Sequence, residues 1–216
     1  FPYLPNDLIK YIYAIDLNGD NQLDIFYHVP SGGEPFITQI FLNKGAYYKT
    51  VFKGYQDIRE MKFDLNRLVS FRLNNPGCCA DPQTVEYYYD ITYNNNEPIF
   101  SLSKTTGNLY PTEKTKNTFN PIQEFSINID NSILRKECYF LDGVEHPVTG
   151  GEGNIIATYK KGAKGKAIGF KKDGQNEWIY VIMNSPNMIK SCEFSTFMEQ
   201  PTNIYGWMKK SETDLK

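Results

Sequence analysis

Five oxygen-bearing side chains recur at every second position between residues 16 and 24: Asp16, Asn18, Asp20, Gln22 and Asp24. Three of them are carboxylates, and like charges so close together repel one another unless a cation lies among them. A hard cation such as calcium takes about six to eight oxygen ligands. The spacing therefore predicts a calcium loop, with a backbone carbonyl from Gln22 and side-chain oxygens from the other four residues. The alternative is a metal-free turn in which the same polar residues stay solvated.

The segments on either side of this loop are apolar and rich in β-branched and aromatic residues. Residues 11–15 lead into the loop and residues 23–29 lead out of it. Such runs favour strands, so we expect the loop to connect two strands. A helix-loop-helix calcium site would also need Gly at the sixth loop position and Glu at the twelfth. This chain has Asn21 and Tyr27 there, which excludes that type of site.

The pattern Asp-x-Asn-x-Asp-x-x-x-Asp, flanked by strands, resembles the loop of FG-GAP and VCBS-type repeats. The resemblance covers roughly residues 10–45, in which residues 40–45 look like the next strand and turn. It implies a calcium site within a β-hairpin. Residues 64–67 are similar to a degenerate copy of the loop, but Arg67 replaces the third carboxylate, so we predict no second site there.

Composition limits the class of protein. A chain of 216 residues suggests one or two domains, and 16 Tyr with 14 Phe favour β structure. The formal net charge is -2, which argues against a nucleic-acid or polybasic membrane-binding surface. No run of eighteen apolar residues predicts a transmembrane helix. We expect a bacterial periplasmic or extracellular protein whose leader has been removed, and a lipid anchor upstream stays open.

The order of apolar runs and turn residues predicts an all-β protein of two domains. We expect an antiparallel β-sheet domain over residues 1–102, a linker over residues 103–121 that is poor in apolar residues, and a second domain over residues 122–216. Short strands separated by Gly- and Asp-rich turns predict a small barrel in the second domain. The expected strands are 8–15, 23–29, 36–42, 47–52, 58–63, 68–73, 85–93, 99–102, 125–129, 134–140, 154–159, 167–170, 178–183 and 205–208.

Four landmarks after residue 122 occur in the order seen in bacterial SH3-like domains. They are Leu134-Arg135, the strand 155–159 with a following Gly turn, Trp178-Ile179-Tyr180-Val181, and Gly206-Trp207 before a charged tail. The chain departs from the family at residues 136–138, where small residues and a proline are usual. The resemblance implies an SH3-like barrel that binds a peptide, protein or cell-wall glycan ligand in an aromatic groove.

The candidate groove residues are aromatic: Tyr139, Tyr159, Trp178, Tyr180 and Trp207. A small barrel also needs bulky side chains inside, so a role for the two tryptophans in the core is the alternative. Lysines at positions 160, 161, 164, 166, 171 and 172 form a basic edge, for which a solvated face is the simpler interpretation than an anionic partner.

The four cysteines are Cys78, Cys79, Cys138 and Cys192, and their spacing matches no zinc motif. One or two disulfides, or buried free thiols, are both consistent with it. Only two histidines occur, and no nucleophile or phosphate-loop motif is present, so we predict no enzyme. The sequence leaves three classes open: a calcium-stabilised binding module, a structural envelope protein without a small ligand, and a cysteine-dependent hydrolase or redox protein.

Overall fold

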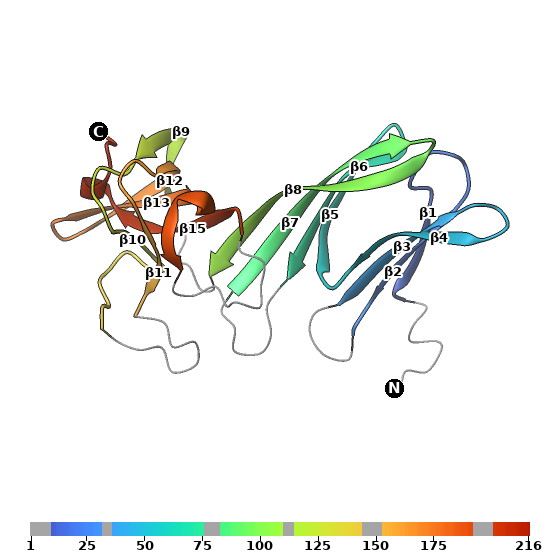
Figure 1. Cartoon of the computed structure of the whole chain (residues 1–216), viewed down its shortest axis with the longest axis horizontal. Coiled ribbons are helices and arrows are strands. Elements are labelled where there is room, and N and C mark those ends of the chain that lie inside the picture. The colour runs from blue at the N-terminus through green and yellow to red at the C-terminus, as the bar shows by residue number, and fades with distance from the viewer. Residues whose placement is uncertain (1–9, 32–35, 76–82, 110–114, 144–152, 192–200) are drawn as a thin grey trace. The chain divides into compact units, whose positions relative to one another are not determined.

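The computed structural model describes residues 10–31, 36–75, 83–109, 115–143, 153–191 and 201–216. These residues form strands, with two short 3-10 helices, η1 (Ser185–Asn187) and η2 (Lys210–Glu212). The prediction of an all-β protein is therefore confirmed. Within these ranges no helix is long and apolar enough to cross a membrane. The chain divides into two compact units, residues 1–79 with 85–105, and residues 80–84 with 106–216 (Figure 1).

The division into units falls inside strand β8 (Glu97–Leu109). Residues 103–121, which we expected to be a linker, are in large part strand. Strand β8 continues to Leu109, and strand β9 begins at Asn117, so much of residues 103–121 pairs in sheets. Residues 110–114 lie outside the described ranges. The side chains of residues 101–104 are all exposed, so this part of β8 has no apolar alternation to mark it in the sequence.

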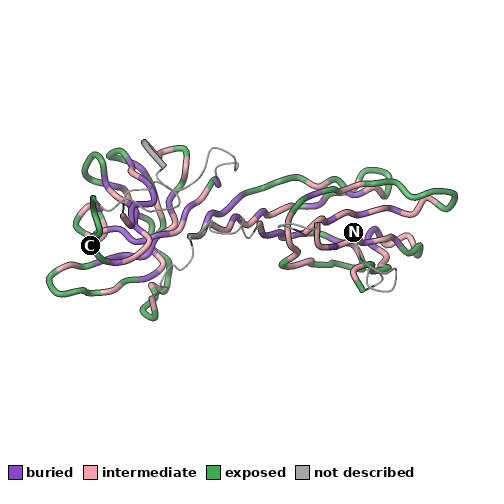
Figure 2. The backbone as a smooth tube through the Cα atoms, turned by 90° about the horizontal axis from the view of Figure 1, so that it is seen from below, coloured by how far each residue is buried: buried purple, intermediate pink, exposed green. Residues whose placement is uncertain are grey.

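The first unit contains two antiparallel sheets, of order β1-β2-β3-β4 and β8-β7-β6-β5. Along β3 buried and half-buried residues alternate, because one face of the sheet turns inward. Buried residues follow the strands, whereas the hairpin ends are exposed (Figure 2). The strands are β1 (Ile12–Ile15), β2 (Asp24–Val29), β3 (Ile37–Asn43), β4 (Tyr48–Gly54), β5 (Asp57–Asp64), β6 (Arg67–Asn75), β7 (Gln83–Asn94) and β8 (Glu97–Leu109).

Aromatic rings from both sheets meet inside the first unit. Phe71 of β6 lies 6.1 Å from Phe26 of β2 and 5.3 Å from Phe52 of β4, both edge-on. Phe52 also approaches Tyr89 of β7 at 5.4 Å and Phe100 of β8 at 4.9 Å. Phe71 is 1% exposed, and these ring contacts add to the burial of apolar area. The two sheets thus share one aromatic core centred on Phe71.

Two tight hairpin turns of the first unit use residues with positive φ. Leu65 and Asn66 connect β5 to β6, and Asn95 and Asn96 connect β7 to β8. Consecutive residues in this conformation are typical of a type I′ turn. Residues 64–67, which resemble a degenerate acidic loop in sequence, are therefore a two-residue hairpin turn.

The second unit contains strands β9 to β15 and the end of β8. Antiparallel pairing gives the order β9-β12-β13-β15-β10-β11-β14. Strand β15 also pairs in parallel with residues 106 and 107 of β8. The strands are β9 (Asn117–Ser126), β10 (Ser132–Arg135), β11 (Ile155–Tyr159), β12 (Lys164–Asp173), β13 (Asn176–Asn184), β14 (Met188–Ser191) and β15 (Asn203–Lys209).

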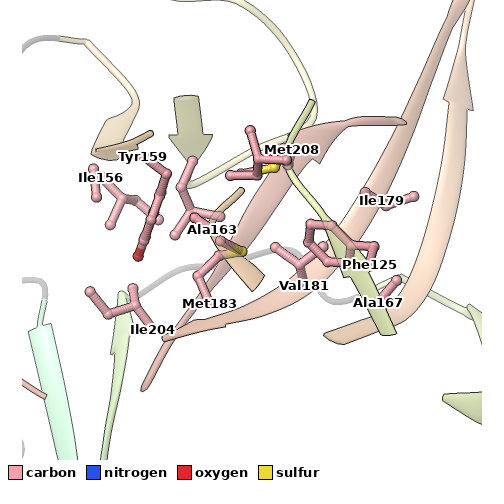
Figure 3. Packing of buried hydrophobic residues seen from close by; sticks show 13 residues of the cluster. Phe125, Ile156, Tyr159, Ala163, Ala167, Ile179, Val181, Met183, Ile204 and Met208 are labelled. Atoms are coloured by element: carbon pink, nitrogen blue, oxygen red, sulfur yellow. The ribbon is translucent and has the colours of Figure 1, made fainter. Parts of the chain in front are cut away.

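Two clusters of buried side chains lie in the described part of the second unit. The larger cluster includes Phe125, Tyr159, Ile179, Val181 and Met208 (Figure 3). The smaller one consists of Cys138, Trp178, Tyr180 and Trp207. Strand β13 contributes to both clusters, because residues 178–181 are all buried.

Gly206 lies where strand β15 packs closely against strand β10. A Cβ atom at this position would lie 2.7 Å from Leu134 Cγ and 2.8 Å from the carbonyl oxygen of Arg135. These distances are shorter than van der Waals contact, so only glycine allows β15 to approach β10 there. Trp207 then follows with no exposed surface, paired with Arg135.

Candidate functional site

The predicted calcium loop connects β1 to β2 and ends at Asp24, the first residue of β2. Asp24 has no exposed surface. Its Oδ2 accepts a hydrogen bond from the amide of Leu17 at 2.9 Å, and its Oδ1 accepts one from the amide of Asn43 at 2.8 Å. Asn43 in turn donates its side-chain amide to the carbonyl of Leu23 at 3.1 Å. One buried carboxylate therefore joins the start of the loop to the end of β3.

Asp16 organises the first half of the loop. Its Oδ1 accepts hydrogen bonds from the amides of Gly19 at 2.8 Å and Asp20 at 3.2 Å, and its Oδ2 accepts one from Asn21 at 2.9 Å. Gly19 and Asn21 have φ of 73° and 66°, a conformation that glycine and asparagine adopt most readily. Gly19 and Asn21 therefore favour the tight turn that these hydrogen bonds require.

Asn18, Asp20 and Gln22 continue the same pattern. The amide nitrogen of Asn18 donates to Asp20 Oδ2 and to the carbonyl of Asn96, both at 2.9 Å. Asn18 Oδ1 accepts from the amide of Asp20 at 3.2 Å, and Asp20 Oδ1 accepts from the amide of Gln22 at 2.9 Å. Asn18 has no exposed surface, and its bond to Asn96 fixes the loop to the tip of the β7–β8 hairpin.

The loop also contacts β6 and β7 through its one buried apolar residue. Leu17 is 1% exposed, and its carbonyl accepts a hydrogen bond from the amide of Leu68 at 3.0 Å. The hydroxyl of Tyr93 lies 2.7 Å from the same carbonyl and 2.9 Å from that of Leu68. The sequence gives no sign of the residues that hold the loop in place, because each acts through backbone groups or from a distant strand. These residues are Leu17, Asn43, Leu68, Tyr93 and Asn96.

The electrostatics of the loop are unfavourable for Asp24. Burial raises the pKa of the Asp24 carboxyl, the hydrogen bonds from Asn43 and Leu17 oppose that increase, and the charges of Asp20 and Asp16 add to it. In the described part of the chain, no basic side chain lies within ion-pair distance of these three carboxylates. The loop therefore concentrates negative charge. The side chain of Arg67 lies against Gly19 of the loop but forms no ion pair with these carboxylates in the described residues.

Whether the loop residues fit a cation depends on their free lone pairs. Among the described residues no three His, Cys, Asp or Glu side chains are arranged to hold a metal ion. The carboxylates of Asp16 and Asp20 point at loop amides, but an oxygen that accepts one hydrogen bond keeps further acceptor capacity. Amide and carbonyl oxygens, such as those of Asn18 and Gln22, are also calcium ligands. The donor set thus suits a hard cation, and calcium binding stays a prediction.

The predicted groove residues do not gather on one open surface. Tyr159, Trp178, Tyr180 and Trp207 are each at most 4% exposed and lie in the two core clusters. Tyr139 is 44% exposed. Burial raises the pKa of the Tyr159 hydroxyl, which has no hydrogen-bond partner in the described residues. Four of the five aromatic side chains therefore fill the second unit from within.

A pocket does open beside Trp178. It has a volume of about 220 Å³ and is lined by Phe119, Phe170, Lys171, Lys172, Glu177, Trp178 and Lys210. The rings of Phe119 and Phe170 are 5.1 Å apart, and Phe170 is 40% exposed. Glu177 pairs with Lys172 at 2.8 Å and with Lys210 at 3.3 Å, which lowers the pKa of its carboxyl. Three lysines against one glutamate leave this pocket basic.

The cysteines are described only in part. Cys138 is a buried free thiol within the smaller core cluster. Cys78, Cys79 and Cys192 lie outside the described residues, so the choice between disulfides and thiols for them stays a prediction.

Comparison of the chain with models of protein families, with curated proteins and with solved structures finds no significant match.

Proposed function

We propose that this protein is a non-catalytic binding protein of the bacterial envelope, periplasmic or extracellular. Its first unit is a β-sheet domain of the FG-GAP/VCBS kind that calcium stabilises at residues 16–24. Its second unit is an SH3-like module that binds a peptide, protein or cell-wall glycan ligand. The observation that supports the proposal most is the position of the acidic loop. The loop holds several hairpins of the first unit together, and its carboxylates form no ion pair with a basic side chain of the described residues.

Calcium would bind at the loop through Asp16, Asn18 and Asp20, with the backbone of Gln22 and the carboxylate of Asp24. Its charge would remove the repulsion that Asp16 and Asp20 exert on Asp24. Because Asn18 is bonded to Asn96 and Asp24 to Asn43, a cation that orders the loop also orders the hairpins behind it. The role of the ion is thus structural, and ligand binding belongs to the second unit.

The raised pKa of Asp24 gives this proposal a pH dependence. Without metal, the folded loop holds a proton on Asp24 more tightly than the unfolded chain does. The stability that this carboxyl contributes is therefore fully present below its ordinary pKa and is lost as pH rises through the raised pKa. Calcium binds only the deprotonated carboxylates, so the stabilisation by calcium should increase as pH rises.

We expect calcium to raise the melting temperature of the first unit at pH 7 and to have little effect near pH 4. A hundredfold excess over Kd corresponds to about 2.7 kcal/mol of stabilisation. Differential scanning calorimetry in calcium and in chelator measures it, and Asp20→Asn should lose the shift. Asp64→Asn, which alters an exposed aspartate at the β5–β6 turn, is the matched control. Equal melting temperatures with and without millimolar calcium at pH 7 would contradict the prediction.

The pocket beside Trp178 is the proposed contact point of the second unit. Phe170 offers an exposed ring next to Phe119, and the lysines give the pocket a positive rim. Its volume accommodates one side chain or one sugar ring rather than a whole peptide or glycan. Such a pocket suits a module that binds one unit of a polymer.

We expect Phe170→Ala to weaken binding to arrayed peptides or to soluble peptidoglycan fragments by at least about tenfold, which is 1.4 kcal/mol. Removing an exposed anchoring ring loses contact area without opening the core. Ile189→Ala, at an exposed apolar residue of β14, is the control. Saturable binding to either probe set that is unchanged in Phe170→Ala would contradict the pocket, and no binding to either set would favour the structural envelope protein.

A further inference from the structure

A second group of polar side chains lies at the opposite end of the first unit from the acidic loop. Strand β2 begins at Asp24 in the loop and reaches His28 four residues later, about 13 Å along the strand. Here Gln56 Oε1 and Asp57 Oδ1 are buried acceptors without a hydrogen-bond partner in the described residues. Asn74 is 3% exposed and lies opposite Asp57 in the register of β5 and β6. Its side-chain amide nitrogen is also buried without a hydrogen-bond partner in the described residues.

Unpaired atoms of this kind call for a physical explanation. Burying one polar atom without a partner costs about 1–3 kcal/mol, and a buried charge costs more unless it is paired or binds a metal. No basic side chain of the described residues lies within ion-pair distance of Asp57. A water molecule could bond to these atoms, but it would not neutralise the carboxylate.

His28 is held beside these acceptors in a defined orientation. Its Nδ1 lies 2.9 Å from Thr38 Oγ1, and Thr38 Oγ1 donates to the carbonyl of Gln56 at 2.7 Å. A hydroxyl has one hydrogen, so Thr38 must accept from His28, and Nδ1 of the imidazole carries the proton. Phe36 stacks on the ring at 4.6 Å. With Nδ1 protonated, the neutral form of the imidazole has its lone pair on Nε2, and the buried Thr38 fixes the other nitrogen.

The same contacts bring His28, Gln56 and Asp57 to one end of the unit. Thr38 bonds to both His28 and Gln56, and Gln56 precedes Asp57 in the chain. Burial lowers the pKa of His28, and the charge of Asp57 acts on it in the opposite direction. A histidine whose second nitrogen donates to an oxygen is the usual arrangement of a metal-binding imidazole.

We propose that this end of the first unit binds a divalent transition-metal ion of the zinc class, through His28 Nε2, the Asp57 carboxylate and Gln56 Oε1. Imidazole nitrogen and carboxylate oxygen together suit zinc, cobalt or nickel better than calcium, which prefers oxygen ligands alone. The amide nitrogen of Asn74, which has no partner in the described residues, would donate to water on the ion. The site is separate from the acidic loop and does not depend on calcium.

Isothermal titration of the chelator-treated full chain with zinc at pH 7 tests the proposal. We expect binding that His28→Gln and Asp57→Asn each weaken by more than about tenfold, since each removes a direct ligand. Asp20→Asn, in the acidic loop, should bind zinc as the unaltered chain does, which separates this site from the calcium proposal. Zinc affinity that is the same in His28→Gln as in the unaltered chain, or no zinc binding at all, would overturn it.

A second measurement does not depend on the folding of those variants. The chain has two histidines, so in His146→Gln the only imidazole is that of His28. Diethyl pyrocarbonate modifies the free imidazole nitrogen, and zinc should slow that reaction by at least about tenfold by occupying Nε2. A rate that zinc leaves unchanged would rule out His28 as a ligand.

Discussion

Replacing Asp24 by alanine should lower the free energy of unfolding of the first unit by roughly 2–4 kcal/mol. The Asp24 carboxylate accepts the amide hydrogens of Leu17 and Asn43 and has no exposed surface. Alanine leaves both amides without an acceptor, and water reaches neither without opening the loop. The loss should be present without calcium, since these hydrogen bonds belong to the protein alone.

The measurement must separate the two units. Both tryptophans lie in the second unit, so tryptophan fluorescence reports that unit and hydrogen exchange of the Leu17 and Asn43 amides reports the first. Asp24→Ala should accelerate exchange and leave the tryptophan transition in urea unchanged. Asp64→Ala, at an exposed turn, should cost less than about 0.5 kcal/mol. A loss for Asp24→Ala no larger than for this control would contradict the described role.

Replacing Phe71 by alanine should cost the first unit about 3–5 kcal/mol. Phe71 is 1% exposed and its ring packs against Phe26 and Phe52 of the facing sheet and against Tyr89 and Phe100 of its own. The cavity that alanine leaves lies between two sheets whose backbones are fixed by hydrogen bonds, so it cannot collapse fully.

Urea denaturation followed by the tyrosine near-ultraviolet signal tests this prediction. Phe63→Ala is a matched control, because Phe63 is 39% exposed and the same side chain is removed. We expect the control to cost less than about 1 kcal/mol. Similar losses for the two variants would show that the aromatic core does not hold the sheets together.

Much of the fold could be predicted because most strands bury one face. The apolar run of residues 36–42 predicted β3, and the Gly and Asn residues predicted the turns. The extension of β8 through residues 103–109 could not be predicted, because residues 101–104 are exposed on both faces and mimic a linker in composition. Strand β14 was missed for a related reason, since it is short and follows a proline-containing turn.

For the candidate sites, the sequence predicted the residue types but not the contacts that these residues make. The spacing of Asp16, Asn18 and Asp20 identified the polar loop, but not that its acceptors bind its own amides. Trp178 and Tyr180 lie on a strand buried on both faces, so no alternation could tell a groove from a core. The partners of His28 come from β3 and from the residues between β4 and β5, and only the fold brings them together.

The most direct test of the central claim is the amount of calcium that the protein binds. Equilibrium dialysis of the full chain against radioactive calcium at pH 7 should give one ion per chain, and Asp16→Asn and Asp20→Asn should each lower the occupancy at the same free calcium concentration. The same occupancy in the loop variants as in the unaltered chain, or no bound calcium at millimolar concentration, would contradict the claim that residues 16–24 bind calcium.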